Sequence, residues 1–410
     1  MKQLKDLPWF GRLVVGAVSL AVRRLRLPAK WFGFVVLGVA DQKLESGSEH
    51  PTAIRVEYPL PFGVATSAEL PTGAIFGRSF ESARCRVLRP TKVARHHDAK
   101  VATYFDKWDN VFSLVLNRND RILPVDLVEP DGGSGWKLAG RHARLLRKHR
   151  TCLQRSDRAA FLFQNWCGNY YHWLVYHLPR AYVLSRDCPG LPVLVPTAQQ
   201  LPNVVALTLP IFNLGSSMQI PLHEGVISLR ECVHVTMDLH PPPELRAVST
   251  RLRNAFAQPW RTSPRRIYVS RKAARWRRLV NEEQVINLLV DYDFEVVAFE
   301  ALDFAEQVAI CATAEIIAGA HGAGLTNMMF APQGAIVVEF VSERFPNSDY
   351  YSLANALGHH YAMARAEAVG AVQDVAYDDI SVPIDTLRPV ILRAIALQHV
   401  YGKSATKMAM

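Results

Sequence analysis

The stretch "EIIAGAHGAGLTN" at residues 315–327 gives the strongest structural signal in this chain. It opens with a short apolar run typical of a buried strand, and then three glycines surround one histidine. Gly322 and Gly324 lack a Cβ, so the backbone there can approach an anion closely. A helix that begins near Leu325 would add unpaired N–H groups and a partial positive charge. The stretch predicts a strand, a turn and a helix start that suit a phosphate, and a turn without further purpose is the alternative.

Known phosphate-binding patterns do not describe this stretch. A P-loop needs lysine where Leu325 stands, and the dinucleotide pattern GxGxxG is replaced here by the order GxxGxG. The glycines also follow the third strand of their unit, whereas the dinucleotide pattern follows the first. His321 on its own is typical of a turn or core histidine as much as of a catalyst.

The residues around this stretch alternate between strand and helix patterns. Short β-rich runs predict strands, and amphipathic runs between them predict helices that begin at Asn281 and Asp303, each with Gln or Glu three residues later. This alternation favours a parallel sheet with right-handed crossovers. The expected strands are 266–270, 294–299, 315–319 and 335–340, and the expected helices are 281–292 and 303–314.

A second βαβ pattern precedes the run "HPPPE" at 240–244. Strands are expected at 159–164 and 191–196, with a helix between them at 170–185 that Pro179 should kink. Three consecutive prolines predict a stiff linker. The fold class is therefore α/β, with two Rossmann-like domains that face each other across a cleft.

These patterns divide the chain into four parts. We expect an apolar and basic N-terminal segment (1–50), an acceptor-side Rossmann-like domain (51–240), a nucleotide-sugar-binding Rossmann-like domain (245–360) and a C-terminal extension (361–410) whose helix packs back on the N-terminal domain. The apolar runs 13–22 and 31–40 are each too short to span a bilayer. A basic break separates them, which favours peripheral contact with an anionic membrane or packing on the protein's own core.

The composition fits a folded protein with an anionic partner. The 410 residues are 49% hydrophobic and carry a formal charge of +10, which suits nucleic acid, an anionic membrane or an acidic substrate. No nucleic-acid-binding module is recognisable, so nucleic acid is not expected as a partner. The six cysteines have no metal or disulfide spacing, which predicts reduced thiols.

An arginine-rich stretch, "RRIYVSRKAARWRR" at 265–278, surrounds the first strand of the second pattern. The carboxyl ends of the first and third strands of a parallel sheet lie at the same edge, so Arg271 should lie beside the glycine-rich turn. Guanidinium groups together with a helix N-terminus suit a diphosphate. A solvated basic loop is the alternative for most of these arginines.

Three stretches together resemble glycosyltransferase family 61. They are "NWCGNYYHWLVYHLPR" (165–180), "RRIYVSRKAARWRRLVNEEQVINLLVDYDFEVV" (265–297) and "LDFAEQVAICATAEIIAGAHGAGLTNMMFAPQGAIVVEF" (302–340), and the resemblance covers roughly 160–345. It implies the GT-B arrangement of two Rossmann-like domains and an inverting transfer of a hexosyl or pentosyl group. It also implies a bacterial member that acts in capsule or exopolysaccharide biosynthesis, in the cytoplasm and at the periphery of the inner membrane.

The resemblance also implies roles for single residues. The donor is a nucleotide sugar, with UDP-sugars favoured, and neither a permanently bound cofactor nor a metal ion is expected. Asn327 would contact the phosphates or the sugar, and Glu339 the ribose hydroxyls. The expected diphosphate-binding residues are Arg271, Arg266, Arg275, His321, Gly322, Ala323 and Gly324.

The general base is expected on the opposite domain. The resemblance places His172 where an acceptor glycan would enter, with Asn169 and Tyr171 beside it, and the alternative is a histidine held within an aromatic cluster. His321 is the second candidate. Many relatives carry an acidic residue near the pair at positions 176 and 177, and this chain has none there. An inactive relative that binds glycans or scaffolds polysaccharide assembly is the alternative function.

Overall fold

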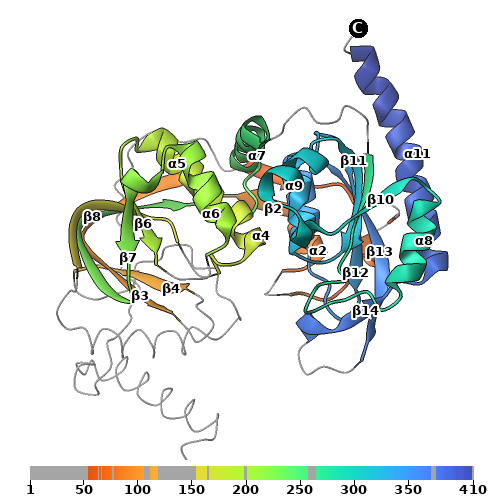
Figure 1. Ribbon diagram of the computed structural model, residues 1–410, viewed down its shortest axis with the longest axis horizontal. Helices are drawn as coiled ribbons and strands as arrows, with labels where there is room; N and C mark the ends of the chain where they lie inside the picture. The colour runs from red at the N-terminus through yellow and green to blue at the C-terminus, as the bar shows by residue number, and fades with distance from the viewer. Residues whose placement is uncertain are drawn as a thin grey trace, which may run out of the picture.

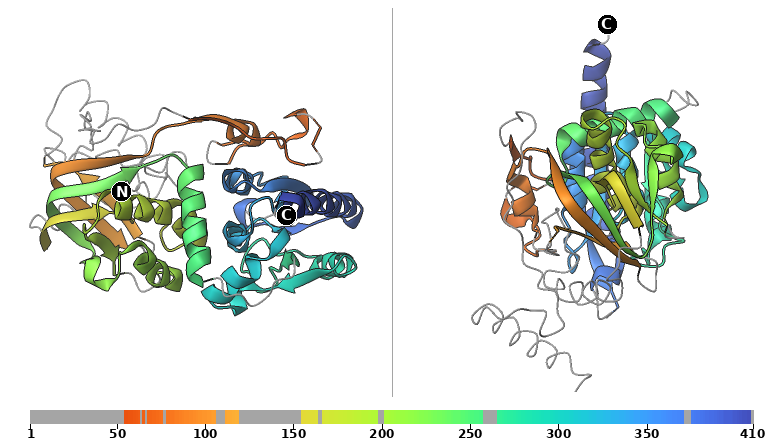
Figure 2. Two further views of the ribbon diagram at one scale, coloured as in Figure 1. Left: turned by 90° about the horizontal axis from the view of Figure 1, so that it is seen from above. Right: turned by 90° about the vertical axis from the view of Figure 1, so that its left-hand side faces the viewer.

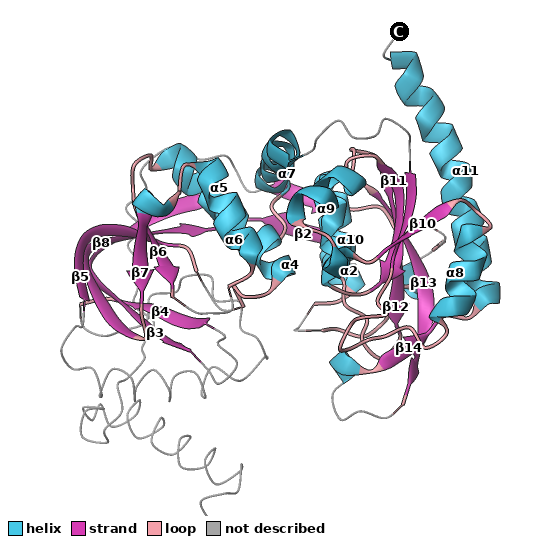
Figure 3. Ribbon diagram, in the orientation of Figure 1, coloured by secondary structure: helices cyan, strands magenta, loops and turns pink. Residues whose placement is uncertain are grey.

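The protein contains two six-stranded sheets that lie side by side, with one long helix between them (Figures 1 and 3). This computed structural model describes residues 54–62, 64–65, 67–75, 78–105, 111–118, 154–163, 166–197, 201–256, 265–370 and 375–408. The helix between the sheets is α7 (Pro242–Phe256), which packs against helices of both halves. We expected the proline run at 240–244 to form an extended linker, but α7 begins inside it at Pro242. This is possible because proline is tolerated in the first turn of a helix.

The second sheet has the strand order β10-β9-β11-β12-β13-β14. Its first five strands are parallel, and β14 runs antiparallel along the edge. The chain order reverses between β9 and β11, which makes the carboxyl ends of these two strands the switch point of a doubly wound sheet. The strands are β9 (Arg265–Val269), β10 (Phe294–Val297), β11 (Ala314–Ala320), β12 (Ile336–Ser342), β13 (His360–Val369) and β14 (Asp379–Ser381).

The helices of this half lie close to where the sequence predicts them. The capping box of Asp303 and Glu306 is present at the start of α9. Asn281 precedes α8 but does not cap it, because its side chain exchanges two hydrogen bonds with the backbone of Val382. The elements are α8 (Glu282–Val290), η6 (Phe299–Ala301), α9 (Phe304–Cys311), η7 (Ala323–Phe330), α10 (Asp349–Leu357), η8 (Val375–Tyr377) and α11 (Ile384–Met408).

The first sheet has the order β4-β3-β8-β5-β6-β7 and is mixed. Strands β8, β5, β6 and β7 are parallel, whereas the long strand β3 is antiparallel to both β4 and β8. The expected Rossmann-like pattern therefore describes only part of this sheet. Its strands are β3 (Lys92–Phe105), β4 (Val111–Leu116), β5 (Gln154–Phe161), β6 (Val193–Pro196), β7 (Gln219–Leu222) and β8 (Gly225–Thr236).

The helix expected at 170–185 consists of three pieces. The segment α4 (Tyr170–His172) leads into a π-helical turn, η3 (Trp173–His177), and then into α5 (Leu178–Asp187), which has Pro179 in its first turn. Proline has no N–H to donate to the preceding turn, and a π-turn accommodates that loss. The Arg180 guanidinium donates a hydrogen bond to the Tyr176 carbonyl at 2.5 Å. Helices α6 (Asn203–Thr208), η4 (Leu209–Phe212) and η5 (Ser216–Met218) complete this half.

The segment 54–88 belongs with the second sheet, not with the acceptor-side domain to which the sequence assigned it. Phe62 forms a parallel bridge with Ala362 of β13, and the buried ring of Phe80 packs against Tyr351 and Tyr361. Figure 2 shows this segment in orange along one side of the second half. Its elements are β1 (Ile54–Glu57), η2 (Ser67–Glu69), α2 (Phe80–Arg84) and β2 (Cys85–Leu88).

The C-terminal helix also differs from the prediction. We expected the extension after residue 360 to pack on the N-terminal domain, but β13 and β14 continue the second sheet, and α11 lies on its face. Leu387 and Ile391 of α11 are fully buried in a core with Tyr268 and Phe340. A parallel sheet needs cover on both faces, and α8 and α11 supply it on this one.

The sequence also raised expectations about membrane contact and about the cysteines. No helix in the described ranges combines the length and the apolar character that crossing a bilayer requires. The apolar runs 13–22 and 31–40 lie outside these ranges, so the expected membrane contact stays a prediction. The cysteines in the described ranges are free thiols, namely Cys85, Cys167, Cys188, Cys232 and Cys311.

Candidate functional site

The glycine turn (residues 321–324) lies at the switch point of the second sheet. Gly319 of β11 pairs with Val269, the last residue of β9, so the segments that follow the two strands are neighbours. The chain leaves β11 at Ala320, and η7 begins at Ala323. The first N–H groups of a helix have no carbonyl partner within that helix. Those of η7 lie at the edge of the sheet where ligands of this fold class bind.

Arg271 lies directly against this turn. A Cβ added at Gly322 would be 1.7 Å from Nη1 of Arg271, so no residue with a side chain fits there without displacing the guanidinium. Nε of Arg271 donates to the Arg277 carbonyl at 3.0 Å, and Nη2 donates to the Trp276 carbonyl at 2.6 Å. The arginine is therefore held in place by carbonyls of its own loop. The predicted adjacency of Arg271 and the glycine-rich turn is observed.

A second arginine, Arg277, reaches the same turn. Its Nε donates to the His321 carbonyl at 3.1 Å, and its guanidinium lies 5.7 Å from the ring centroid of Phe345. Burial lowers the pKa of Arg277, and burial together with the neighbouring Arg277 charge lowers that of Arg271. No described carboxylate forms an ion pair with the Arg271 guanidinium. Sequence reasoning placed Arg277 in the basic stretch but did not select it.

His321 and Glu339 form a buried pair. Nδ1 of His321 is 2.6 Å from Oε1 of Glu339, and the Tyr361 hydroxyl donates to Oε2 at 2.6 Å. Burial raises the pKa of Glu339 to about 8 and lowers that of His321 well below its ordinary value. The Glu339 side chain has no exposed surface, and both of its oxygens are engaged. The predicted contact of Glu339 with the ribose hydroxyls therefore does not fit its position. It orients the histidine instead.

Three other predicted donor residues face elsewhere. Asn327 is 1% exposed, and its amide bonds Tyr170 and Gln307 rather than a ligand. Arg266 lies at the opposite end of β9 and bonds the Gln398 side chain and the Tyr292 carbonyl. Arg275 is exposed and covers the Trp276 ring, so it does not line the turn.

Ala323 and Gly324 do lie at the predicted turn. Ala323 is the first residue of η7. Gly324 packs against β9, since a Cβ there would lie 2.8 Å from Cγ1 of Val269. Gly324 therefore allows η7 to pack closely on β9. We had expected it to let the backbone approach an anion.

His172 lies on α4 of the first half, inside an aromatic cluster. Its ring centroid is 5.4 Å from that of Tyr171 and 5.1 Å from that of Tyr176. Burial, together with the positive charge of Arg78, lowers the pKa of His172 to about 4. Among the residues that the structure describes, its buried Nδ1 has no hydrogen-bond partner. The aromatic cluster named as the alternative does surround His172, and its role as the general base stays a prediction.

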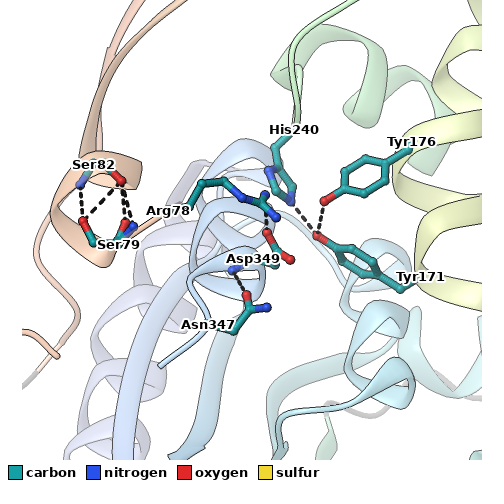
Figure 4. A network of polar contacts seen from close by, with 8 residues as sticks. All are labelled: Arg78, Ser79, Ser82, Tyr171, Tyr176, His240, Asn347 and Asp349. Carbon is teal, nitrogen blue, oxygen red and sulfur yellow. Dashed lines mark hydrogen bonds and ion pairs between the residues drawn. The ribbon is translucent and has the colours of Figure 1, made fainter. Parts of the chain in front are cut away.

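The predicted acceptor-side residues have structural roles. The Asn169 side chain caps α4 by accepting from the amides of Tyr171 at 3.0 Å and His172 at 3.3 Å. Tyr171 is 6% exposed, and its hydroxyl lies 2.7 Å from Nε2 of His240 and 3.2 Å from the Tyr176 hydroxyl (Figure 4). The Tyr171 hydroxyl is engaged by these contacts, whereas Asn169 is exposed, and its acceptor-side role stays a prediction.

Edge-on ring contacts connect the two candidate histidines across the halves. Tyr171 lies next to His172, the Tyr171 and Tyr350 ring centroids are 5.3 Å apart, and Tyr350 lies 4.9 Å from His321. The Tyr350 hydroxyl also donates to the Gly322 carbonyl at 2.6 Å. Arg78, from the segment 54–88, joins this junction through its ion pair with Asp349 (Figure 4). Sequence reasoning missed Arg78, Asp349 and Tyr350, which no local pattern distinguishes.

Comparison with known proteins supports the enzyme class. The Glycosyltransferase 61 family model matches residues 170–338, which include α4, the arginine-rich loop and the glycine turn. The chain is 33% identical over 165 residues to the EGF domain-specific O-linked N-acetylglucosamine transferase of Drosophila melanogaster, covering 39% of this chain and 29% of that protein. It is 38% identical over 79 residues to a beta-1,2-xylosyltransferase of Oryza sativa subsp. japonica, covering 19% of this chain and 14% of the relative.

These relatives are glycosyltransferases by name, one of them a pentosyltransferase, which agrees with the expected class. The chain spans less than a third of the length of either. Both are eukaryotic proteins, so the bacterial capsule subgroup stays a prediction. In the part of the chain that can be described, no three His, Cys, Asp or Glu side chains could hold a metal ion together, and the metal requirement also stays a prediction.

Proposed function

We propose that this protein transfers a sugar from a nucleotide-sugar donor to a hydroxyl group of an acceptor, with the donor diphosphate bound at the glycine turn. The convergence of Arg271 and Arg277 on the turn at 321–324 carries this proposal. Two guanidinium groups and the first amides of η7 offer donors for several phosphate oxygens at once. The match of the glycosyltransferase model to this region supports the same reading.

The transfer would be one displacement with inversion. The acceptor oxygen forms a bond to the anomeric carbon, the bond to the β-phosphate oxygen breaks, and its electron pair stays on the diphosphate. Because negative charge grows on that oxygen in the transition state, Arg271 and Arg277 would lower the barrier electrostatically. The acceptor would approach from the first half, in keeping with a GT-B arrangement in which the two sheets carry opposite sides of the site.

His172 is our candidate for the base that takes the acceptor proton. Its buried Nδ1 has no hydrogen-bond partner in the described part of the chain, and a pKa of about 4 keeps the ring neutral near pH 7. A bound diphosphate would raise this pKa, since a nearby negative charge favours the protonated ring. Glu339 holds Nδ1 of His321 and so orients that ring, which leaves Nε2 as the nitrogen that could take a proton, and His321 therefore stays the second candidate. His172→Ala should abolish transfer and keep nucleotide binding, whereas the exposed His223→Ala should change neither.

Donor binding tests the proposal. Calorimetric titration with UDP, GDP, dTDP and CMP should identify one nucleotide that binds the wild-type protein. Arg271→Ala should weaken that binding about 10-fold to 100-fold, because a charge-assisted contact contributes about 1.5–3 kcal/mol. Arg266→Ala removes an arginine from the other end of the same strand and should leave the affinity unchanged. Equal affinities of the Arg271→Ala and wild-type proteins would contradict the proposal.

The acceptor and the cellular site extend the proposal beyond the geometry. We propose a growing cell-surface glycan as the acceptor and the cytoplasmic face of the inner membrane as the location, on the resemblance of residues 160–345. Turnover of donor sugar with isolated cell-surface glycans would test this. Nucleotide binding without turnover of any donor would instead favour an inactive relative that binds or scaffolds glycans.

A further inference from the structure

Two large aromatic side chains are exposed together at the edge of the second sheet. Trp276 keeps 43% of its surface exposed and Tyr377 keeps 40%. Their ring centroids are 5.0 Å apart, with the planes tilted by 50°. Burial of apolar rings is favourable, so an exposed pair of aromatic rings is a candidate surface for a ligand.

The aromatic pair of Trp276 and Tyr377 lies directly beside the proposed phosphate site. The Trp276 carbonyl accepts from Nη2 of Arg271 at 2.6 Å, and the next residue, Arg277, donates to the His321 carbonyl. The indole is thus attached to the same short loop that places both guanidinium groups on the glycine turn. A group joined to a bound diphosphate through one ribose would reach this surface.

The loop that carries Trp276 is fixed at both ends. At its start, the Arg271 amide donates to Oε1 of the buried Glu282 at 2.9 Å. At its end, Arg278 makes three hydrogen bonds to the carboxylate of Asp379, the first residue of β14, at 2.8, 3.2 and 2.8 Å. Anchors on both sides hold the indole at a set position, which reduces the ordering cost of binding to it.

One face of the indole already accommodates a planar group. The Arg275 guanidinium lies 4.8 Å from the Trp276 ring centroid, and Arg275 itself is exposed. A guanidinium stacked on an aromatic face at the surface contributes little to stability. A flat aromatic ligand can therefore replace the Arg275 guanidinium on the indole face.

We propose that the aromatic pair of Trp276 and Tyr377 binds the base of the donor nucleotide by stacking. This inference rests on the proposed function, since it requires the diphosphate at Arg271. Both aromatic residues belong to the half that carries the glycine turn, and the base is tied to the diphosphate by a single ribose. An acceptor sugar, which would approach His172 on the other half, fits this position less well.

Separate titrations with UDP, GDP and inorganic pyrophosphate test the inference. Trp276→Ala should weaken binding of the preferred nucleoside diphosphate about 5-fold to 100-fold, as expected for loss of one stacked base. Its affinity for pyrophosphate should not change, because pyrophosphate has no base. Trp276→Phe should retain most of the nucleotide affinity, and Val280→Ala, which alters an exposed side chain near the loop, should retain all of it.

These experiments distinguish failure of base binding at Trp276 and Tyr377 from failure of the proposed sugar transfer. If Trp276→Ala binds the nucleotide as the wild-type protein does, the inference is wrong; an effect confined to the KM for the acceptor would assign the surface to a sugar ring. If Arg271→Ala binds pyrophosphate normally, or if no nucleotide binds the wild-type protein, the proposed function fails and the inference fails with it. Circular dichroism of each variant would show that the fold is retained.

Discussion

The guanidinium of Arg78 and the carboxylate of Asp349 lie 2.6 Å apart, although 271 residues separate them in the chain (Figure 4). Arg78 precedes α2 in the segment that packs on the second sheet, and Asp349 begins α10. Their side chains are 28% and 12% exposed. The pair therefore attaches the early segment to the place where the two halves meet.

This ion pair should be measurable in a double-mutant cycle. Arg78→Ala or Asp349→Asn alone should lower the free energy of unfolding by about 1–3 kcal/mol, because each leaves a half-buried partner uncompensated. The double variant should lose less than the sum of the two. Urea unfolding gives the three values, and strictly additive losses would show that the two groups do not interact.

Gly322→Ala should abolish nucleotide binding without unfolding the protein. The added Cβ would meet Nη1 of Arg271 at 1.7 Å, so the guanidinium must leave the turn. Gly215→Ala is the matched control, since it lies on extended backbone with no atom within 4 Å of its Cβ. Titration calorimetry with the preferred nucleotide compares the two; retained affinity in Gly322→Ala would remove Arg271 from the site.

Gly324→Ala should act on stability rather than on binding chemistry. Its Cβ would lie 2.8 Å from Cγ1 of Val269, and overpacking of this kind costs about 1–3 kcal/mol. Val269→Ala removes the methyl group that this Cβ would meet. Adding Gly324→Ala to a Val269→Ala protein should therefore lower the stability less than adding it to the wild-type protein. Thermal unfolding of the four proteins checks this, and a Gly324→Ala protein as stable as the wild type would show that the contact relaxes freely.

The buried carboxyl of Glu339 should make stability depend on pH. Its pKa rises from an ordinary value of 4.5 to about 8 in the folded protein, so between these values the folded state holds a proton that the unfolded state has released. Stability relative to Glu339→Gln should therefore fall as the pH rises from 4.5 to 8, by at most about 1.4 kcal/mol per pH unit, and level off above 8. Urea unfolding of both proteins at several pH values measures the difference, and a difference independent of pH would mean that the carboxyl is not shifted.

Local patterns were sufficient to predict four strands of the second sheet, β9 to β12, and the edge that carries the glycine turn, but not β13 and β14. The strands β9 to β12 and the capping box at Asp303 come from apolar runs, turn residues and caps that act over a few residues. The adjacency of Arg271 and the glycine turn followed from one further rule, that parallel strands bring their carboxyl ends to the same edge. These features depend on near neighbours and on regular geometry, which the sequence displays directly.

The rest of the site depends on contacts between distant parts of the chain. Sequence position could not show that Glu339 is fully buried behind His321, that Arg266 and Arg275 point away, or that Asn327 bonds Tyr170. It also could not show that Arg78 arrives from the segment before the first sheet. The sequence by itself determined which elements form and which edge carries the glycine turn, because backbone geometry and hydrophobic period are local. Only the tertiary structure decided which side chains reach that edge, because burial and pairing depend on what folds against each residue from elsewhere in the chain.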